Sequence, residues 1–345
     1  MSNSNMQQSP SSLSAKRIDY IDTAKGLLII LVVFGHCQIT YLGPISILLM
    51  PAFFAISGLF FKPNDGFRTM LVKKCNKILI PFLFFYTIAY LIIIAKVCAG
   101  ADIDHSFVAF FVDKDRLSVN GVVWFLLALF WANLLFYALC RISSNMIFLA
   151  LASLSLMAMS LLLFTGENAL PFYLDAGLTA MPFFCLGYCL RKTEIIFSDK
   201  YNRYLPYIIP ALCAIAAVCY VVGGEPCIII SCNEVSGSAP LFMLFSTALI
   251  MAVLFLSKAI GFIPIVTYMG RYSLIIFCFH MPVVETVGHC LLLAGFDIFT
   301  VPVNIVVFIV SLCITTLTIK PFIRWFPKFT AQKDLIALSH NTRPC

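Results

Sequence analysis

Ten long apolar segments restrict the fold of this chain more than any other feature of its sequence. Each is about 18 to 22 residues long, which is enough to cross the hydrocarbon core of a bilayer as an α-helix. The chain has 345 residues, is 61% hydrophobic and 11% charged, and has a mean hydropathy of +0.98. A soluble core cannot enclose that much apolar surface. We therefore predict an all-α polytopic membrane helix bundle with about ten transmembrane helices. The predicted spans lie near residues 24–42, 45–61, 78–98, 121–139, 145–164, 171–190, 204–222, 239–257, 272–293 and 300–319.

The basic residues predict the orientation of these helices. If the N-terminus is cytoplasmic, all but three of the 23 lysines and arginines fall on inner segments, and Lys96, Lys114 and Arg116 fall outside. This distribution satisfies the positive-inside rule, so both termini are predicted to be cytoplasmic. The basic residues are scattered over inner loops and are not gathered with exposed aromatic residues, which argues against nucleic acid as a partner.

A single membrane domain is the simplest organisation. We predict a disordered cytoplasmic tail over residues 1–16, the membrane domain over 17–320, and a basic cytoplasmic tail over 321–345. The 14 cysteines include no CxxC pair and no Cys/His spacing suited to zinc, so no metal site is predicted. Cys227 and Cys232 share a predicted outer loop, where they either form a local disulfide or stay reduced.

Three ionisable residues share one face of the first predicted helix. Lys25 and His36 are eleven residues apart and lie within about 20° of each other, and Asp22 falls within about 60° of both. Lipid tolerates such groups poorly, so they must point into protein or water. Taken alone, Lys25 is better explained as a helix-end lysine that snorkels to the cytoplasmic surface, and Asp22 as its ion-pair partner. His36 lies about 16 Å deeper than Lys25, and this depth favours a functional role over a structural one.

A second cation and histidine lie in the ninth predicted helix. Arg271 is at its cytoplasmic mouth, and His280 is about 13 Å further in. An arginine that only sets orientation and a histidine that only hydrogen-bonds beside Pro282 explain these residues equally well. A further inner basic cluster contains Lys73, Lys74 and Lys77.

These segments resemble, in order, the sequence blocks of the integral-membrane acyltransferase-3 family. The matching blocks are Asp19–Gly26, Val32–His36, Met50–Gly58, Lys77–Phe82, Trp124–Leu126, Phe184–Tyr188 and Gly270–Pro282. Members of this family are ten-helix bacterial membrane enzymes that typically acetylate surface sugars. In their first helix a basic residue, often arginine, precedes a histidine by ten intervening positions. Lys25 and His36 have that spacing, and the lysine is similar to the fucose-acetylase-like branch.

The resemblance implies a bacterial inner-membrane enzyme that transfers acetyl from acetyl-CoA to a hydroxyl of a cell-surface polysaccharide or its lipid-linked precursor. It implies no permanently bound cofactor, because acetyl-CoA is a donor substrate. The expected partners are therefore acetyl-CoA, a glycan or lipid-linked glycan, and the lipid bilayer. Ser57 and Ser273 are interpreted as helix-packing residues, since neither has a Ser-His-Asp context in the sequence.

The resemblance and the layout of the helices together suggest the roles of the site residues. His36 is expected to act either as a general base on the acceptor hydroxyl or as a covalent acyl carrier. Asp22 would hold Lys25 in place, and His280 would orient or polarise the reacting groups. Cations at the inner mouth would hold the phosphates of the donor. The predicted donor-binding residues are Lys25, Arg271, Lys73, Lys74 and Lys77.

Two other classes of function compete with this hypothesis. A multi-pass transporter or flippase can also use mid-membrane histidine, lysine and aspartate, as a proton relay. Against it, the two halves of the sequence contain no corresponding pair of interrupted helices. A non-catalytic membrane scaffold would leave the two mid-membrane histidines without a purpose.

Overall fold

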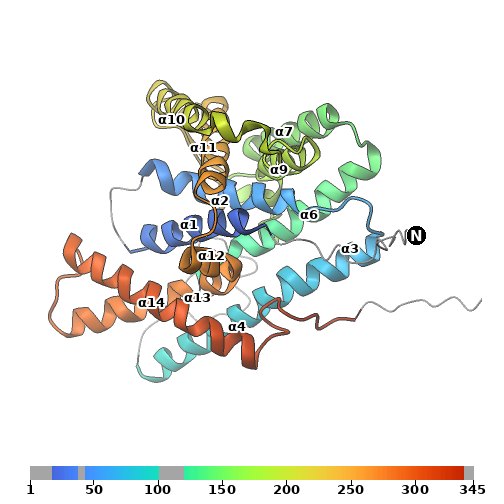
Figure 1. The fold of residues 1–345 in the computed structure, drawn as a ribbon. Coiled ribbons are helices and arrows are strands. Elements are labelled where there is room, and N and C mark those ends of the chain that lie inside the picture. Colours follow the sequence, from blue (N-terminus) through green and yellow to red (C-terminus); the bar gives the residue numbers. More distant parts are fainter. Residues whose placement is uncertain (1–17, 38–42, 101–119, 338–345) are drawn as a thin grey trace, which may run out of the picture.

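The computed structural model describes residues 18–37, 43–100 and 120–337, and in residues 43–47 it describes the backbone alone. The predicted N-terminal tail and the predicted outer residues Lys114 and Arg116 lie outside the described residues. Within them, the regular structure is a bundle of helices with one short hairpin (Figure 1).

Most of the helices follow the apolar segments of the sequence, and the short helices Phe67–Lys74 and Pro264–Arg271 lie between these segments. They are α1 (Asp19–Gly35), α2 (Gly43–Leu59), α3 (Phe67–Lys74), α4 (Ile80–Cys98), α6 (Trp124–Ile142), α7 (Met146–Leu163), α8 (Leu174–Thr179), α9 (Met181–Lys192), α10 (Leu205–Val222), α11 (Ala239–Ile260), α12 (Pro264–Arg271), α13 (Ser273–Leu293) and α14 (Val301–Trp325). A π-helical turn, η2 (Cys75–Leu79), joins α3 to α4. Short 3₁₀ helices are η4 (Gly121–Val123), η5 (Gly166–Asn168), η6 (Pro171–Tyr173) and η7 (Asp199–Tyr204).

A two-stranded hairpin connects α10 to α11. Strand β1 (Cys227–Ile229) pairs antiparallel with β2 (Glu234–Ser236). Cys227 is a free thiol in the structure, so the disulfide to Cys232 that the sequence allowed is not formed there.

Several of these helices have the length and composition of membrane spans. In the described part of the chain seven helical segments qualify, and an eighth is added if residues 171–179 and 181–192, which meet at a bend of 54°, form one span. Pro182 lies at the start of α9, where its missing N–H favours such a break. The structure therefore confirms an all-α fold with multiple membrane-length helices. The count of ten spans and the cytoplasmic termini stay predictions.

The first and last helices differ in their bounds from the predicted spans. Helix α1 begins at Asp19, because acidic residues in its first turn stabilise the helix N-terminus, and ends at Gly35. His36 is therefore the C-cap of α1 and not a residue inside a helix that runs to 42. Helix α14 continues to Trp325, past the predicted end at 319.

A very close helix crossing fixes the start of α1. Helix α1 packs along α12, and a Cβ atom on Gly270 would overlap the backbone oxygen of Asp22. Small residues permit this approach between membrane helices. The hydroxyls of Thr23 and Thr267 lie 2.7 Å apart across the same crossing. The crossing therefore brings Asp22 beside the end of α12.

A second close helix crossing, at a glycine of α2, determines which face of α2 packs against α9. Helix α2 packs along α9, and a Cβ on Gly58 would overlap the backbone oxygen of Phe184. At about 100° per residue, Met50, Phe53 and Ser57 share a face of α2 that is turned roughly 80° to 140° away from Gly58. That face of α2 is therefore available to line cavities.

Candidate active site

Two histidines from distant parts of the chain meet where α1 ends beside α13. The centres of the His36 and His280 rings are 4.9 Å apart, in an edge-to-face arrangement. Nε2 of His280 lies 3.4 Å from Nδ1 of His36. His280 is completely buried, whereas His36 is exposed to the cavities beside it. The two histidines that the sequence singled out in separate helices thus form one centre.

Backbone carbonyls determine which nitrogen of each ring carries the proton. Nδ1 of His36 lies 2.8 Å from the carbonyl oxygen of Val32, and Nδ1 of His280 lies 2.7 Å from that of Phe277. A carbonyl oxygen only accepts, so the proton of each neutral ring is assigned to Nδ1 and the lone pair to Nε2. The Nε2 lone pair of His280 then faces the Nδ1–H of His36. Nε2 of His36 is the atom that can take a proton or attack a carbonyl carbon.

The segment of α13 that carries His280 contains a proline whose effect on the helix is compensated. Pro282 has no N–H, so the carbonyl of Cys278 lacks its usual helical donor. Nδ2 of buried Asn120 donates to this carbonyl at 2.8 Å. An unsatisfied carbonyl inside a membrane is costly, so Asn120 both stabilises α13 and holds the start of η4 beside His280.

His36 lines two separate cavities. The central cavity, of about 250 Å³, lies between α1, α2, α6 and α13 and includes Met50, Trp124 and Phe277. The α14 cavity, of about 430 Å³, lies between α1, α13 and α14 and includes the polar residues Glu285, His289 and Asn304. Two different molecules can therefore approach the same imidazole.

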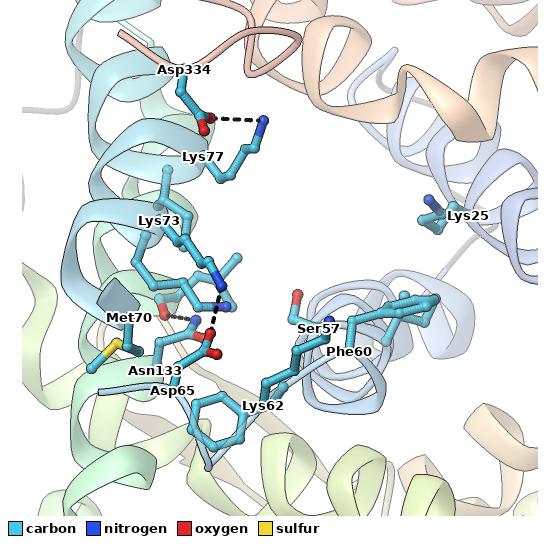
Figure 2. A pocket seen from close by; sticks show the side chains of 15 residues that line it. Lys25, Ser57, Phe60, Lys62, Asp65, Met70, Lys73, Lys77, Asn133 and Asp334 are labelled. Carbon is cyan, nitrogen blue, oxygen red and sulfur yellow. Dashed lines mark hydrogen bonds and ion pairs between the residues drawn. The ribbon is translucent and has the colours of Figure 1, made fainter. Parts of the chain in front are cut away.

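A third cavity, of about 580 Å³, lies near the other end of α1 and is lined by lysines. Figure 2 shows Lys25 across this lysine cavity from Lys73 and Lys77. Lys73 pairs with Asp65 at 2.8 Å, and Lys77 pairs with Asp334 at 3.3 Å. Clustered cations around a cavity favour a polyanionic ligand. The lysines that line it are Lys25, Lys62, Lys73, Lys74 and Lys77.

Asp22 links two of the predicted cations. Nζ of Lys25 lies 2.5 Å from one carboxylate oxygen of Asp22, and Nε of Arg271 lies 3.7 Å from the other. Arg271 also lies 3.5 Å from Asp19. Asp22 therefore orients Lys25 toward the lysine cavity, whereas Arg271 pairs with Asp22 and is not among the residues that line this cavity.

An apolar layer one helical turn thick lies between the lysine cavity and the central cavity. On α2, Met50 lines the central cavity and Ser57 lines the lysine cavity, and Phe53 lies about one turn from each. The ring centre of Phe53 is 6.2 Å from that of Phe125 and 6.5 Å from that of Phe277, and the latter two are 5.3 Å apart. We call Phe53, Phe125 and Phe277 the phenylalanine layer.

The predicted site residues thus fall into two groups at opposite ends of α1. His36 and His280 form one group, and Asp22 lies about 20 Å along the helix from them, with the lysines. Sequence reasoning did not single out Asp334, Asn76 or Phe53. A weak signal existed for Phe53, because it shares a helix face with Met50 and Ser57. Asp334 has no such signal, since it meets Lys77 only through the tertiary fold.

Comparison with known proteins identifies the family of the chain. A family model described as an acyltransferase domain, that of the acyltransferase-3 family, matches residues 18–320. Neither the curated proteins nor the solved structures compared with the chain include a match. The matched range contains both histidines and all the predicted donor-binding residues, and it covers most of the chain. The chain therefore belongs to the acyltransferase-3 family of membrane acyltransferases.

Proposed function

We propose that this protein transfers an acetyl group from acetyl-CoA to a hydroxyl of a cell-surface glycan or its lipid-linked precursor, at the bacterial inner membrane. The observation that carries the proposal is the position of His36. Its imidazole lies where two cavities meet, with Nε2 as the lone-pair atom, and its own helix leads back to a cavity lined by lysines.

The lysine cavity suits the donor. Coenzyme A carries a diphosphate and a 3′-phosphate at one end, and a narrow pantetheine arm that ends in the thioester. Lysine ammonium groups bind such phosphates through charge-assisted hydrogen bonds. Lys25 and His36 are about 16 Å apart along α1, so phosphates near Lys25 direct the arm toward the central cavity. The arm then crosses the phenylalanine layer, where half-buried Phe53 is the ring with most room to rotate.

The α14 cavity suits a polyhydroxylated acceptor. Glu285 and His289 are exposed and Asn304 is buried, and all three line this cavity together with His36. Carboxylate, imidazole and amide groups are the side chains that hydrogen-bond sugar hydroxyls. An acceptor bound here would meet the thioester at His36 from the opposite side.

The chemistry is direct acyl transfer with His36 as general base. Nε2 of His36 takes the proton of the acceptor hydroxyl while that oxygen attacks the thioester carbonyl carbon. The tetrahedral intermediate then breaks its C–S bond, and the sulfur takes the proton from Nε2 of His36, which returns the ring to neutral. The Nδ1–H of the intervening imidazolium donates to the carbonyl oxygen of Val32, and Nε2 of His280, 3.4 Å from Nδ1, is a second and weaker acceptor that adds to the stabilisation of the charge. Two cavities at one ring admit both substrates together, which favours direct transfer over an acyl-histidine intermediate.

The test replaces His36 by glutamine. His36→Gln keeps size and some hydrogen bonding but cannot take a proton, so transfer should fall by about 10² or more. The measurement is acetylated glycan per unit of membrane-inserted protein, with coenzyme A binding as the control for folding. Specific activity close to that of the wild type would contradict the proposal. Recovery of an acetylated protein after acid quench would instead favour the acyl-carrier mechanism.

A further inference from the structure

The segment that follows α14 folds back onto the helix bundle beside η2 and α4. We call residues 326–337 the strap. Its anchor is Asn76, a buried residue of η2. Oδ1 of Asn76 accepts from the backbone N–H groups of Leu335 and Ile336, both at 2.9 Å, and Nδ2 donates to the carbonyl of Ile336 at 2.9 Å. Both polar ends of the amide are used, so Asn76 fixes the strap at one point.

Other contacts hold the strap along its length. Nζ of Lys77 donates to the carbonyl of Ala331 at 2.7 Å. The ring of Phe329 stacks on that of Phe84 of α4, with centres 5.2 Å apart. Figure 1 shows the chain beyond α14, in red, returning beside α4. The strap therefore has a defined path beside the entrance of the lysine cavity.

One residue of the strap reaches the cavity itself. Asp334 lines the lysine cavity, and its carboxylate lies 3.3 Å from Nζ of Lys77 (Figure 2). The two side chains are about half exposed, with 48% of Lys77 and 51% of Asp334 accessible. Exposed ion pairs of this kind contribute little to stability, so the strap depends on Asn76 more than on Asp334. The carboxylate can therefore leave Lys77 without unfolding the strap.

We propose that the strap is an autoinhibitory element of the donor site. When the site is empty, the Asp334 carboxylate pairs with Lys77, where a donor phosphate would otherwise bind. Donor phosphate displaces the carboxylate, and Asn76 keeps the strap tethered. The inference rests on the proposed function, because it requires a phosphate-bearing donor in the lysine cavity. The family match ends at residue 320, so the strap lies outside the matched domain.

The first experiment measures the Kd of coenzyme A for the full-length protein in nanodiscs of neutral lipid. D334N removes the competing charge, so coenzyme A should bind about two- to fivefold more tightly than to the wild type. The matched control is D199N. Asp199 also pairs with a lysine, Lys258, at 3.4 Å, but lies outside the lysine cavity, so its Kd should equal that of the wild type. An unchanged or weaker Kd in D334N overturns the proposal.

A second variant separates the strap from a local effect of charge. N76A removes the hydrogen bonds that fix residues 335 and 336, so Asp334 is held less firmly beside Lys77, and N76A should tighten coenzyme A binding by up to as much as D334N. The double variant should add nothing further, because both changes act through one contact. Additive effects, or weaker binding in N76A, overturn the tethered strap.

These outcomes are distinct from failure of the proposed function, because Kd does not depend on acetyl transfer. Tighter binding in D334N without any acetylated glycan would leave the strap standing and remove the proposed reaction. If acetylated glycan forms but D334N and the wild type have equal Kd values for coenzyme A, the proposed reaction stands and the autoinhibitory strap is overturned. Failure of coenzyme A to bind any of the proteins contradicts both.

Discussion

The two ends of α1 carry two differently built sites. At its start, Lys25 faces long, flexible lysine side chains that pair with aspartates from a loop and from the strap. At its end, His36 and His280 are short side chains held by the carbonyls of their own helices. The first arrangement can exchange partners when a ligand enters. The second is preorganised, which is what a group that handles a proton in the transition state requires.

The difference also predicts how each end responds to solution conditions. Half-exposed lysine pairs are screened by salt, whereas a contact with a fully buried histidine is not. The affinity for the donor, which depends on the lysines at the start of α1, should therefore fall as ionic strength rises. The turnover rate, which depends on the two histidines at the end of α1, should change little with ionic strength.

Apart from the loss of His36 itself, the largest effect is expected between the two ends, at the phenylalanine layer. Phe53→Trp adds bulk where the pantetheine arm crosses, so transfer should fall by roughly 10² while the Kd of coenzyme A stays unchanged, as expected when reacting atoms are held apart. The matched control is Phe148→Trp on the exposed face of α7. Normal transfer by Phe53→Trp would mean that the donor reaches His36 by another route.

A smaller effect is expected from the partner of the catalytic ring. His280→Leu removes the second acceptor of the His36 Nδ1–H and leaves the Val32 carbonyl in place, so kcat should drop about tenfold, the low end for a hydrogen bond to a charged group. His280→Gln restores an acceptor oxygen and should recover part of the loss. If leucine and glutamine behave alike, His280 acts only through packing, and its role as a hydrogen-bond acceptor for His36 fails.

The smallest effect is expected at the exposed end. Lys25→Ala should raise the KM for acetyl-CoA by about tenfold or less, because one of several phosphate-binding charges is lost. The same variant should show a weaker dependence of KM on salt than the wild type. A fall in kcat at unchanged KM would place Lys25 in the chemistry and not in donor binding.

The sequence could indicate candidate site residues but not how the fold groups them. Lys25 and His36 share a helix face because helical periodicity is a local property. The meeting of His36 with His280 depends on how α13 packs beside α1, which no local pattern specifies. One indication of this meeting is present in the sequence, because a cation followed by a deeper histidine occurs in both helices. The anchoring of the strap by Asn76 joins residues about 260 positions apart, so only the tertiary structure reveals it.

Helix bounds were predictable where composition alone sets them. Helices α11 and α13 begin within a residue of the predicted spans, because apolar runs and flanking polar residues mark their ends. The predicted span over 171–190 is bent instead, since a proline near its middle interrupts the helix. Family membership now favours acyl transfer over the transporter and scaffold hypotheses.

The central claim is that donor binding and chemistry lie at opposite ends of α1. The most direct test measures the Kd of coenzyme A and single-turnover acetyl transfer in the same nanodisc preparations of His36→Gln and Lys25→Glu. His36→Gln should bind coenzyme A like the wild type and lose transfer by about 10² or more. Lys25→Glu should bind weakly and transfer at close to the normal rate once saturated. Parallel loss of binding and transfer in both variants would contradict the division.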